Sequence, residues 1–324
     1  MGSKGRVAVG IVAAILGMAA IAAIAVLSLL PMVETERQTT DPGQKSTQRP
    51  DAIAARDHAA AASGAVAIAV LNMDANHVDD SMRIMRSNMT GLLRETFDTS
   101  AEKMKQSVLQ SKSSVSAKLL DTALVELDNA GRSAKAIVVV GQRTGTNNET
   151  TVTYALQLAL EGSTWKAEGL QPIGTPVPSA GPSPARVGMP TGAANTAFVD
   201  QAATKAVQAA ASAAMQALYS FDYRQVDEYR PRAMACLTGS ARPQFEASAE
   251  NLATALTATD TMSTAEADPV GVVHLGLENA ELLLAVTIST VRSGIVSPET
   301  TTYSTVVRMA KVDGRWLVSD LPKP

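Results

Sequence analysis

The clearest pattern in the chain is a stripe of apolar residues spaced three or four positions apart, the period of an α-helix that buries one face. The stripe consists of Leu93, Phe97, Ala101, Met104 and Val108. It returns 148 residues later as Phe245, Ala249, Leu252 and Leu256. We interpret the two stripes as the core-facing side of the same helix in two copies of one folding unit.

Polar and helix-breaking positions recur at the same distance along the chain. The pairs are Val78-Asp79-Asp80 with Val226-Asp227-Glu228, Asp74 with Asp222, and Thr90-Gly91 with Thr238-Gly239. A folding unit duplicated in tandem must keep its caps, breaks and core positions, whereas a site for one ligand has no need to appear twice. We therefore expect two domains, at residues 52–172 and 193–324.

The first copy is predicted to have three helices followed by strands. An Ala-rich helix ends at Leu71, and Asp74 caps a second helix that Gly91 terminates. The striped helix is third, and after Ser111 the apolar period falls from 3.6 to 2, which is typical of half-buried strands. The expected strands cover 124–127, 136–140 and 152–160, with a last one around Trp165.

The second copy repeats this order. Its predicted helices cover 195–219, 223–237 and 240–258, and its predicted strands cover 270–277, 282–290, 301–310 and 315–320. Asp222 with Gln225 has the spacing of a helix-capping box. Asp313-Gly314 indicates a two-residue hairpin turn of the primed type. Helices followed by an antiparallel sheet predict the α+β class, with three helices packed on a curved sheet in each domain.

The N-terminal region has a different composition. Residues 7–33 contain no charged residue, and such a helix is long enough to span a hydrocarbon core of about 30 Å. A cleavable secretory signal is the alternative, but the apolar run is longer than a typical signal core. Because Lys4 and Arg6 precede the run, we expect a single-pass plasma-membrane protein with a cytoplasmic tail at 1–6 and the rest outside the cytoplasm.

Two polar segments are predicted to be connectors. Residues 34–51 form a flexible stalk, and residues 173–192, rich in Pro, Gly and Ser, link the two domains. The 28 basic and 31 acidic residues nearly balance, which argues against nucleic acid as a partner. The single cysteine, Cys236, excludes a disulfide within the chain, and we interpret it as a small core residue.

Residues with the chemistry of a site are few and scattered. His58, His77 and His274 have no ligand spacing, and the acidic pairs 79–80 and 227–228 stand where acids favour the start of a helix. No Gly-rich phosphate loop follows a strand. We therefore predict no catalytic, cofactor-binding or metal-binding residues, no cofactor, and a protein that is not an enzyme.

Two segments of the second copy carry a family resemblance. Residues 311–321, Lys-Val-Asp-Gly-Arg-Trp-Leu-Val-Ser-Asp-Leu, and residues 218–227, Leu-Tyr-Ser-Phe-Asp-Tyr-Arg-Gln-Val-Asp, resemble segments of actinobacterial Mce-associated membrane proteins. The resemblance implies one membrane helix followed by a cone-shaped domain of the nuclear-transport-factor-2-like (NTF2-like) fold, here present in two tandem copies. The first copy fits less closely, since Leu71-Asn72-Met73-Asp74 replaces the aromatic pair.

The resemblance implies a membrane-anchored accessory protein that binds and stabilises an Mce-type lipid-import complex in the cell envelope, with Mce transporter subunits as its partners. Two alternatives stay open. One is an assembly factor of type IV secretion or conjugation, a class with a similar layout. The other is a module that binds a lipid or steroid in the cone of either domain.

Overall fold

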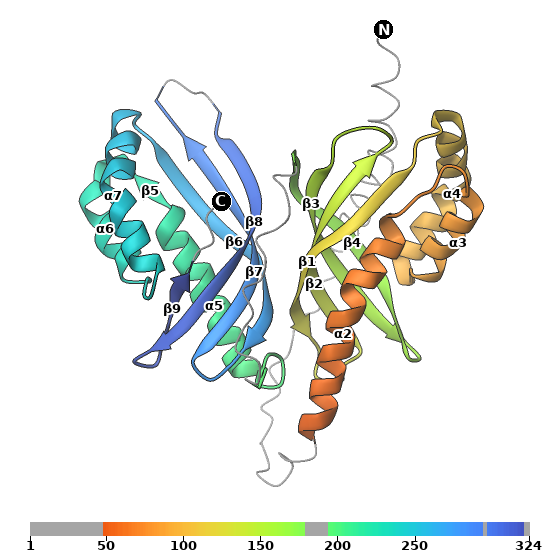
Figure 1. Cartoon of the computed structure of the whole chain (residues 1–324), viewed down its shortest axis with the longest axis horizontal. Coiled ribbons are helices and arrows are strands. Elements are labelled where there is room, and N and C mark those ends of the chain that lie inside the picture. Colours follow the sequence, from red (N-terminus) through yellow and green to blue (C-terminus); the bar gives the residue numbers. More distant parts are fainter. Residues whose placement is uncertain (1–47, 179–193, 294–296, 321–324) are drawn as a thin grey trace. The chain divides into compact units, whose positions relative to one another are not determined.

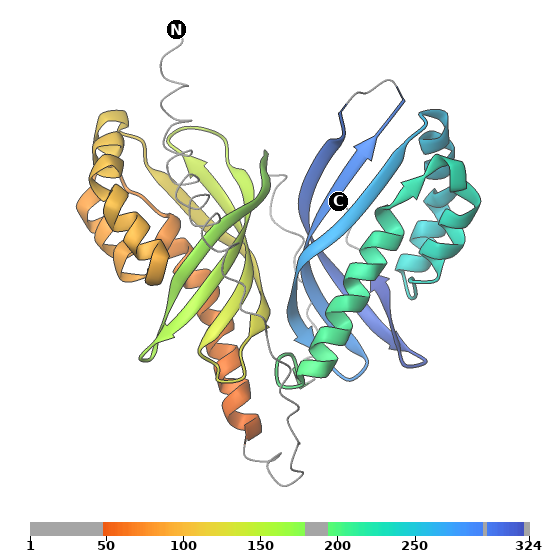
Figure 2. The ribbon, with the colours of Figure 1, turned by 180° about the vertical axis from the view of Figure 1, so that it is seen from behind.

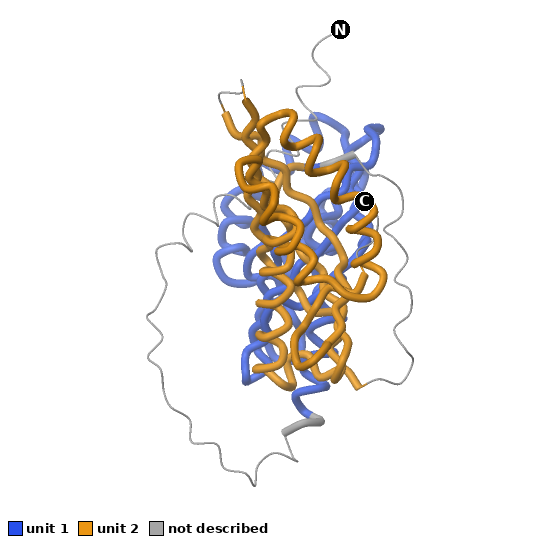
Figure 3. Tube along the Cα trace, turned by 90° about the vertical axis from the view of Figure 1, so that its left-hand side faces the viewer, with its two compact units in different colours: residues 1–172, 176–183 blue, residues 173–175, 184–324 orange. Residues whose placement is uncertain are grey.

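The computed structural model of this chain describes residues 48–178, 194–293 and 297–320. They belong to two compact units, shown in different colours in Figure 3. Unit 1 holds residues 48–172 and 176–178 of this set, and unit 2 holds 173–175, 194–293 and 297–320. The predicted anchor at 7–33 lies outside the described residues, as do most of the predicted stalk and linker.

Unit 1 contains three helices followed by four strands (Figure 1). These are α2 (Gln48–Leu71), α3 (Val78–Ser87), α4 (Gly91–Ser111), β1 (Val115–Leu127), β2 (Ser133–Thr144), β3 (Thr150–Glu161) and β4 (Thr164–Pro178). Strand β2 is antiparallel to both β1 and β3, and β4 lies beside β3. Helix α2 begins inside the predicted stalk, because Pro50 is tolerated in a first helical turn and Asp51 is favourable there.

Unit 2 repeats the order and adds two short elements (Figure 2). Its elements are α5 (Gln201–Tyr219), β5 (Phe221–Asp222), the 3-10 turn η2 (Tyr223–Gln225), α6 (Val226–Met234), α7 (Ala241–Ala258), β6 (Met262–Leu275), β7 (Asn279–Val291), β8 (Glu299–Val312) and β9 (Arg315–Asp320). Strands β6 to β9 pair antiparallel in chain order, and β5 pairs with β6. The predicted α+β class is thus confirmed in both units.

The apolar stripe of the first copy is buried as predicted. The buried members are Leu93, Phe97, Met104 and Val108. In the second copy the prediction is wrong at Leu252, whose side chain is 41% exposed. Helix α7 buries Ala241 and Ala249 and half-buries Phe245, so its contact line follows steps of four residues and leaves Leu252 outside it.

Two predicted caps are wrong because the polar side chains form local turns instead. Asp74 does not cap α3, which begins after His77; its carboxylate accepts hydrogen bonds from the Asn76 amide and the His77 ring, both at 2.9 Å. Asp222 accepts from the Arg224 amide at 3.0 Å and thereby caps the turn η2 rather than α6. Gly91 has the expected positive φ, +53°, but it begins α4 rather than ending α3.

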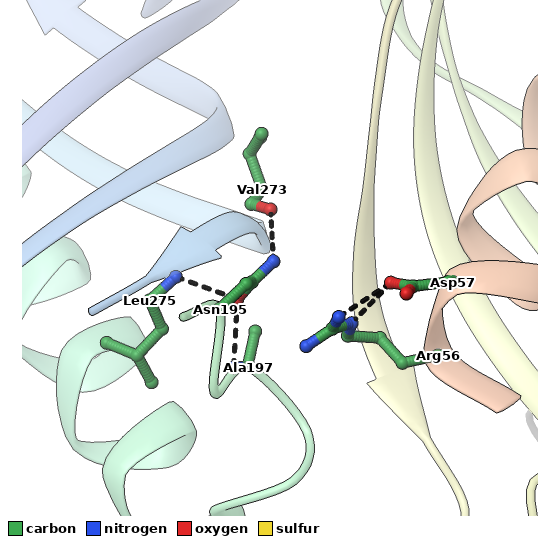
Figure 4. Close-up of polar contacts among 6 residues, drawn as sticks. All are labelled: Arg56, Asp57, Asn195, Ala197, Val273 and Leu275. Carbon is green, nitrogen blue, oxygen red and sulfur yellow. Dashed lines mark hydrogen bonds and ion pairs between the residues drawn. The ribbon is translucent and has the colours of Figure 1, made fainter. Parts of the chain in front are cut away.

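Other boundaries differ from the sequence prediction for local reasons. Helix α5 begins at Gln201 rather than at residue 195, because Asp200 caps it by accepting a hydrogen bond from the Ala203 amide at 2.9 Å. Asn195 instead bonds β6: its side chain donates to the Val273 carbonyl at 3.2 Å and accepts from the Leu275 amide at 3.0 Å (Figure 4). The turn at Asp313-Gly314 is confirmed, with φ of +50° and +79°.

Each copy contains the same hydrogen bond, at positions 148 residues apart in the sequence. The Asn72 side-chain oxygen accepts from the Ala117 amide at 2.8 Å, and the Ser220 hydroxyl accepts from the Ala265 amide at 3.0 Å. Both bonds join the end of the first helix to the first long strand. A side-chain acceptor is needed there because a strand amide without a partner would be costly to bury.

A second equivalent contact joins the end of the second helix to the last strand. The amide of Thr90 donates to the Ala167 carbonyl at 2.8 Å, and that of Thr238 donates to the Val318 carbonyl at 2.8 Å. The offset has become 151 on the strand side because β7 and β8 and the loop between them are longer than their counterparts in unit 1. The shared scaffold therefore includes side chain–backbone and backbone–backbone hydrogen bonds at element junctions.

Among helices within the described ranges, none has the length and apolar character needed to cross a membrane.

Candidate functional site

The acidic pairs lie in the first turns of α3 and α6, as predicted. Asp79 forms an ion pair with Lys105 at 2.5 Å, and Asp80 forms one with Arg83 at 2.9 Å. Asp227 and Glu228 are exposed. Asp80 also lies close enough to His77 to help raise the pKa of that imidazole. These positions suit carboxylates at the start of a helix, and those of α3 also form surface ion pairs.

The three histidines belong to different segments: His58 to α2, His77 to the turn before α3, and His274 to β6. His58 packs edge-on against Trp165, with ring centroids 6.3 Å apart. His77 is exposed beside Asp74, whose carboxylate accepts its hydrogen bond and raises the pKa of the imidazole. His274 is half-buried on β6, in register with Glu281 of β7. In the described part of the chain, no three potential ligands form a group that could hold a metal ion.

Cys236 lies just after α6 and is half-buried. Its Sγ lies 2.9 Å from the Ala233 carbonyl oxygen. Burial raises the pKa of the thiol to about 11, so only a small fraction is thiolate at neutral pH. This environment fits the predicted structural role.

Aromatic rings fill the space between β5, α6 and α7 of unit 2. The rings of Phe221 and Tyr229 meet edge-on at 5.1 Å, and those of Tyr229 and Phe245 at 5.8 Å. The Tyr229 hydroxyl donates to the Leu218 carbonyl at 2.9 Å, and burial raises its pKa to about 12. Side chains thus fill the space between these three elements.

A cavity of about 350 Å³ lies beside this aromatic cluster, at the ends of β5, β6 and β7. Its apolar lining comes from Phe221, Met262, Val291 and Pro298. Met262 and Val291 are register partners across β6 and β7, and their side chains are 36% and 41% exposed. We call this cavity and its lining the rim groove.

A second cavity of about 430 Å³ shares Thr264 and Ser289 with the rim groove. Its other lining side chains are mainly polar: Ser212, Gln216, Glu266 and Thr287. Hydroxyl pairs continue this polar character across β7 and β8, since Thr287 and Thr302 lie 3.0 Å apart and Ser289 and Thr300 lie 3.2 Å apart. The rim groove therefore changes from apolar to polar along β6.

Arg232 of α6 brings a positive charge to the rim groove. Its guanidinium donates to the Ser220 carbonyl at 2.6 Å and lies 5.8 Å from the centre of the Tyr229 ring. These two contacts fix the side chain while leaving other N–H groups of its guanidinium available to a ligand.

The neighbouring charges of the rim groove are already paired. Arg224 holds Asp222 through its side chain and its amide and lowers the pKa of that carboxyl to about 2. Arg230 pairs with Glu246 at 3.3 Å. Arg232 is thus the cation that the rim groove presents to a ligand.

The equivalent positions of unit 1 are built differently. Ser114 takes the place of Met262 at the offset of 148 residues. Gly145 takes the place of Val291 in the strand register, because it lies one position beyond the Val115–Thr144 pair. The Gly145 amide donates to the Ser114 carbonyl at 2.8 Å. The Ser114 hydroxyl also accepts from the Ala75 amide at 2.9 Å. Ile84 stands in place of Arg232. The rim of the first copy is thus closed by polar contacts and carries no guanidinium at this position.

The rim groove was missed in the sequence because it depends on strand register and loop length. Met262 was not assigned to a strand, and Val291 lay beyond the predicted strand end at residue 290. Met262 and Thr264 are two positions apart, as are Ser289 and Val291, so each pair lies on one face of its strand. This spacing indicates a shared surface only when the pairing of β6 with β7 is known.

No protein-family model matches the chain, and no curated protein matches it. Among solved structures, the chain is similar to an "Ntf2 like protein involved in plasmid conjugation" at 12% identity, covering 82% of this chain and 96% of that one with a TM-score of 0.24. It is also similar to a periplasmic fragment of TraM at 14% identity, covering 36% of this chain and 95% of that one with a TM-score of 0.30.

Proposed function

We propose that this chain is a non-enzymatic, membrane-anchored binding protein of the cell envelope, in which two copies of one α+β unit offer different surfaces to partner proteins. The anchor is the apolar segment 7–33. The proposed partners are the subunits of an Mce-type lipid-import complex, which the chain would bind and stabilise.

One observation carries this proposal: the two copies expose apolar side chains at different places. In unit 1 the helices expose Ile84 and Leu109, each 45% accessible, and Leu92. The residues at these positions in unit 2 are polar: Arg232, Ser240 and Thr257. We take these exposed apolar side chains as the candidate contact residues of unit 1.

Unit 2 places its own exposed apolar residues elsewhere. They include Met262 and Val291 at strand ends and Leu252 on α7. The equivalents of the first two are Ser114 and Gly145. Two domains that keep the same junction contacts but differ in these surfaces suit an accessory protein that contacts more than one subunit.

The choice of partner rests on the family resemblance of residues 311–321 and 218–227. The first segment forms the closing hairpin, where Lys311 lies 5.6 Å from the centre of the Trp316 ring. The second segment ends α5 and carries the Asp222–Arg224 pair. Both segments lie in unit 2, and their resemblance makes an Mce-type complex the partner to test first.

The test is a mild-detergent purification of the tagged full-length protein from its native membrane, with mass spectrometry of the co-purified proteins. Leu109→Asp changes an apolar surface position of unit 1, and Thr257→Asp places the same charge at the equivalent position of unit 2 as the control. We expect Mce substrate-binding subunits and permease with the wild type, fewer of them with Leu109→Asp, and no change with Thr257→Asp.

Two outcomes would overturn parts of this proposal. Enrichment of secretion-channel components would replace the Mce partner with a conjugation or type IV secretion assembly. A purification that enriches no envelope protein above an untagged control would contradict the accessory role itself.

A further inference from the structure

The rim groove of unit 2 combines three features that one ligand would satisfy together. It has an apolar lining, a fixed guanidinium at its edge, and a polar extension along β6. We propose that the rim groove binds a medium-chain amphiphile with an anionic head, such as a carboxylate on a saturated chain. This inference does not depend on the partner proposed above.

The apolar part of the ligand would cover Met262 and Val291. These two side chains face each other across β6 and β7 and are both more than one-third exposed. Apolar surface left in contact with water is unfavourable, and a hydrocarbon chain lying between them would remove it. The cavity volume of about 350 Å³ lies near the lower end of the range of roughly 300–1,000 Å³ for ligand pockets, so a medium-length chain fits better than a steroid.

The charged part of the ligand would meet Arg232. Its guanidinium is held by the Ser220 carbonyl and by the Tyr229 ring, so its direction is set before a ligand arrives. A carboxylate can accept two parallel hydrogen bonds from a guanidinium. A cationic head would instead be repelled by Arg232, since Asp222 is already neutralised by Arg224.

The hydroxyls of Thr264 and Ser289 stand at the junction between the apolar and polar parts. They can hydrogen-bond a head group whose carboxylate is bound by Arg232. Glu266 lies farther along the polar extension, where it disfavours a second anionic group. The ligand class is therefore an amphiphile with a single negative charge.

Unit 1 supplies an internal control for this site. At the positions of Met262, Val291 and Arg232 it has Ser114, Gly145 and Ile84, respectively. Ser114 and Gly145 are already engaged with each other and with Ala75 through backbone and hydroxyl hydrogen bonds. Unit 1 has a guanidinium on β2 at Arg143, but it forms an ion pair with Glu149 at 3.5 Å. Ser114 and Gly145 also offer no apolar side chain to the hydrocarbon part of the ligand.

The experiment is hydrogen–deuterium exchange of the full-length protein in lipid nanodiscs, with octanoate as the probe. Exchange is measured by mass spectrometry at increasing octanoate concentration. We expect saturable protection of peptides that contain residues 220–222, 262–264 and 289–291, with no change in peptides that contain 72–74, 114–116 and 143–145. Because protection is localised, partitioning of octanoate into the lipid does not produce it.

Two variants separate the role of Arg232 from a general loss of positive charge. Arg232→Gln should weaken the octanoate response about tenfold, since it removes a charge-assisted hydrogen bond. Arg230→Gln removes the same charge from the same helix at a residue paired with Glu246, and should change the response less than twofold. Octanol, which has the same chain and no charge, should bind more weakly than octanoate and should not distinguish the two variants.

Val291→Asp provides an independent test, because it places a like charge beside the carboxylate and should abolish the protection. Exchange in peptides remote from the rim groove shows that each variant is folded. The proposal is overturned if octanoate gives no localised protection, if both units respond equally, or if Arg232→Gln weakens octanol as much as octanoate.

Discussion

The first and second copies differ most clearly at the turn that follows their second long strand. In unit 1, β2 ends at Thr144 and Gly145 turns the chain at once, with φ of +59°. In unit 2, β7 continues to Val291, which lies in register with Met262 of β6. One added strand position thus replaces a closed polar rim with an open apolar one. The comparison teaches that junction contacts keep the fold while loop geometry determines the surface.

The largest expected effect concerns the striped helix, which is packed tightly in one copy and loosely in the other. Phe97 of α4 is fully buried, whereas its equivalent Phe245 of α7 is half-buried. Phe97→Ala should lower the free energy of unfolding of unit 1 by about 3–5 kcal/mol, because it leaves a core cavity. Phe245→Ala should cost unit 2 less than half as much, since part of that ring is already in water.

Each unit contains one of the two tryptophans, so their unfolding can be followed separately. Trp165→Phe leaves Trp316 as the reporter of unit 2, and Trp316→Phe leaves Trp165 as the reporter of unit 1. Each alanine substitution is compared with its own single-tryptophan parent in urea-induced unfolding. Equal losses in the two units would show that α4 and α7 are packed alike, against the burial difference described here.

A smaller effect is expected at the side chains that accept a hydrogen bond from an amide of the first long strand, β1 in unit 1 and β6 in unit 2. Asn72→Ala and Ser220→Ala each leave a strand amide, that of Ala117 or Ala265, without its acceptor. Each should lower the free energy of unfolding of its unit by about 1–3 kcal/mol. Asn72→Ala should have the larger effect, because the side-chain NH₂ group of Asn72 also donates a hydrogen bond to the Ile68 carbonyl at 2.9 Å.

The same urea titrations of the single-tryptophan parents measure both substitutions. Asn72→Asp keeps an acceptor for the Ala117 amide but loses the donor, and should recover part of the loss. If neither alanine substitution changes the unfolding of its unit, these bonds are not part of the shared scaffold.

The smallest expected difference is the response of the two polar turns to pH. In unit 1, the hydrogen bond to Asp74 raises the pKa of His77, so this pair contributes stability below pH of about 6.5 and loses it as pH rises through the raised value. In unit 2, Arg224 lowers the pKa of Asp222 to about 2. The stability that this ionised carboxyl contributes is fully present above pH of about 4, and it is lost only as the pH falls toward 2.

Raising the pH from 5 to 8 should therefore reduce the urea midpoint of unit 1 slightly and leave the turn of unit 2 unaffected. His77→Asn should remove the difference, and Arg224→Gln should make unit 2 less stable at both pH values. If the pH response of unit 1 persists in His77→Asn, the response comes from another titrating group.

Much of the fold could be predicted because its signals are local. The stripe from Leu93 to Val108 and the primed turn at Asp313-Gly314 are both confirmed, since helical period and turn chemistry depend on neighbouring residues. The exposure of Leu252 could not be predicted, because the rotation of α7 depends on how its alanines contact other elements. Asp74 and Asp222 show that a capping residue can bond a turn instead of a helix.

The rim groove, in contrast, could not be predicted from local sequence signals. Phe221, Met262 and Val291 come together through the pairing of β5, β6 and β7, and Arg232 joins them from α6. A one-residue change in register would turn Met262 and Val291 to the other face of the sheet. The periodicity of the chain predicts the strands but does not determine this pairing.

The most direct test of the claim that one scaffold carries two different surfaces is photo-crosslinking in the native membrane. A photoreactive amino acid is placed at position 109 of unit 1 or at the equivalent position 257 of unit 2, and the crosslinked proteins are identified by mass spectrometry. We expect position 109 to capture an envelope protein that position 257 does not capture. The same partner at the same yield from both positions would contradict the account, as would no partner from position 109.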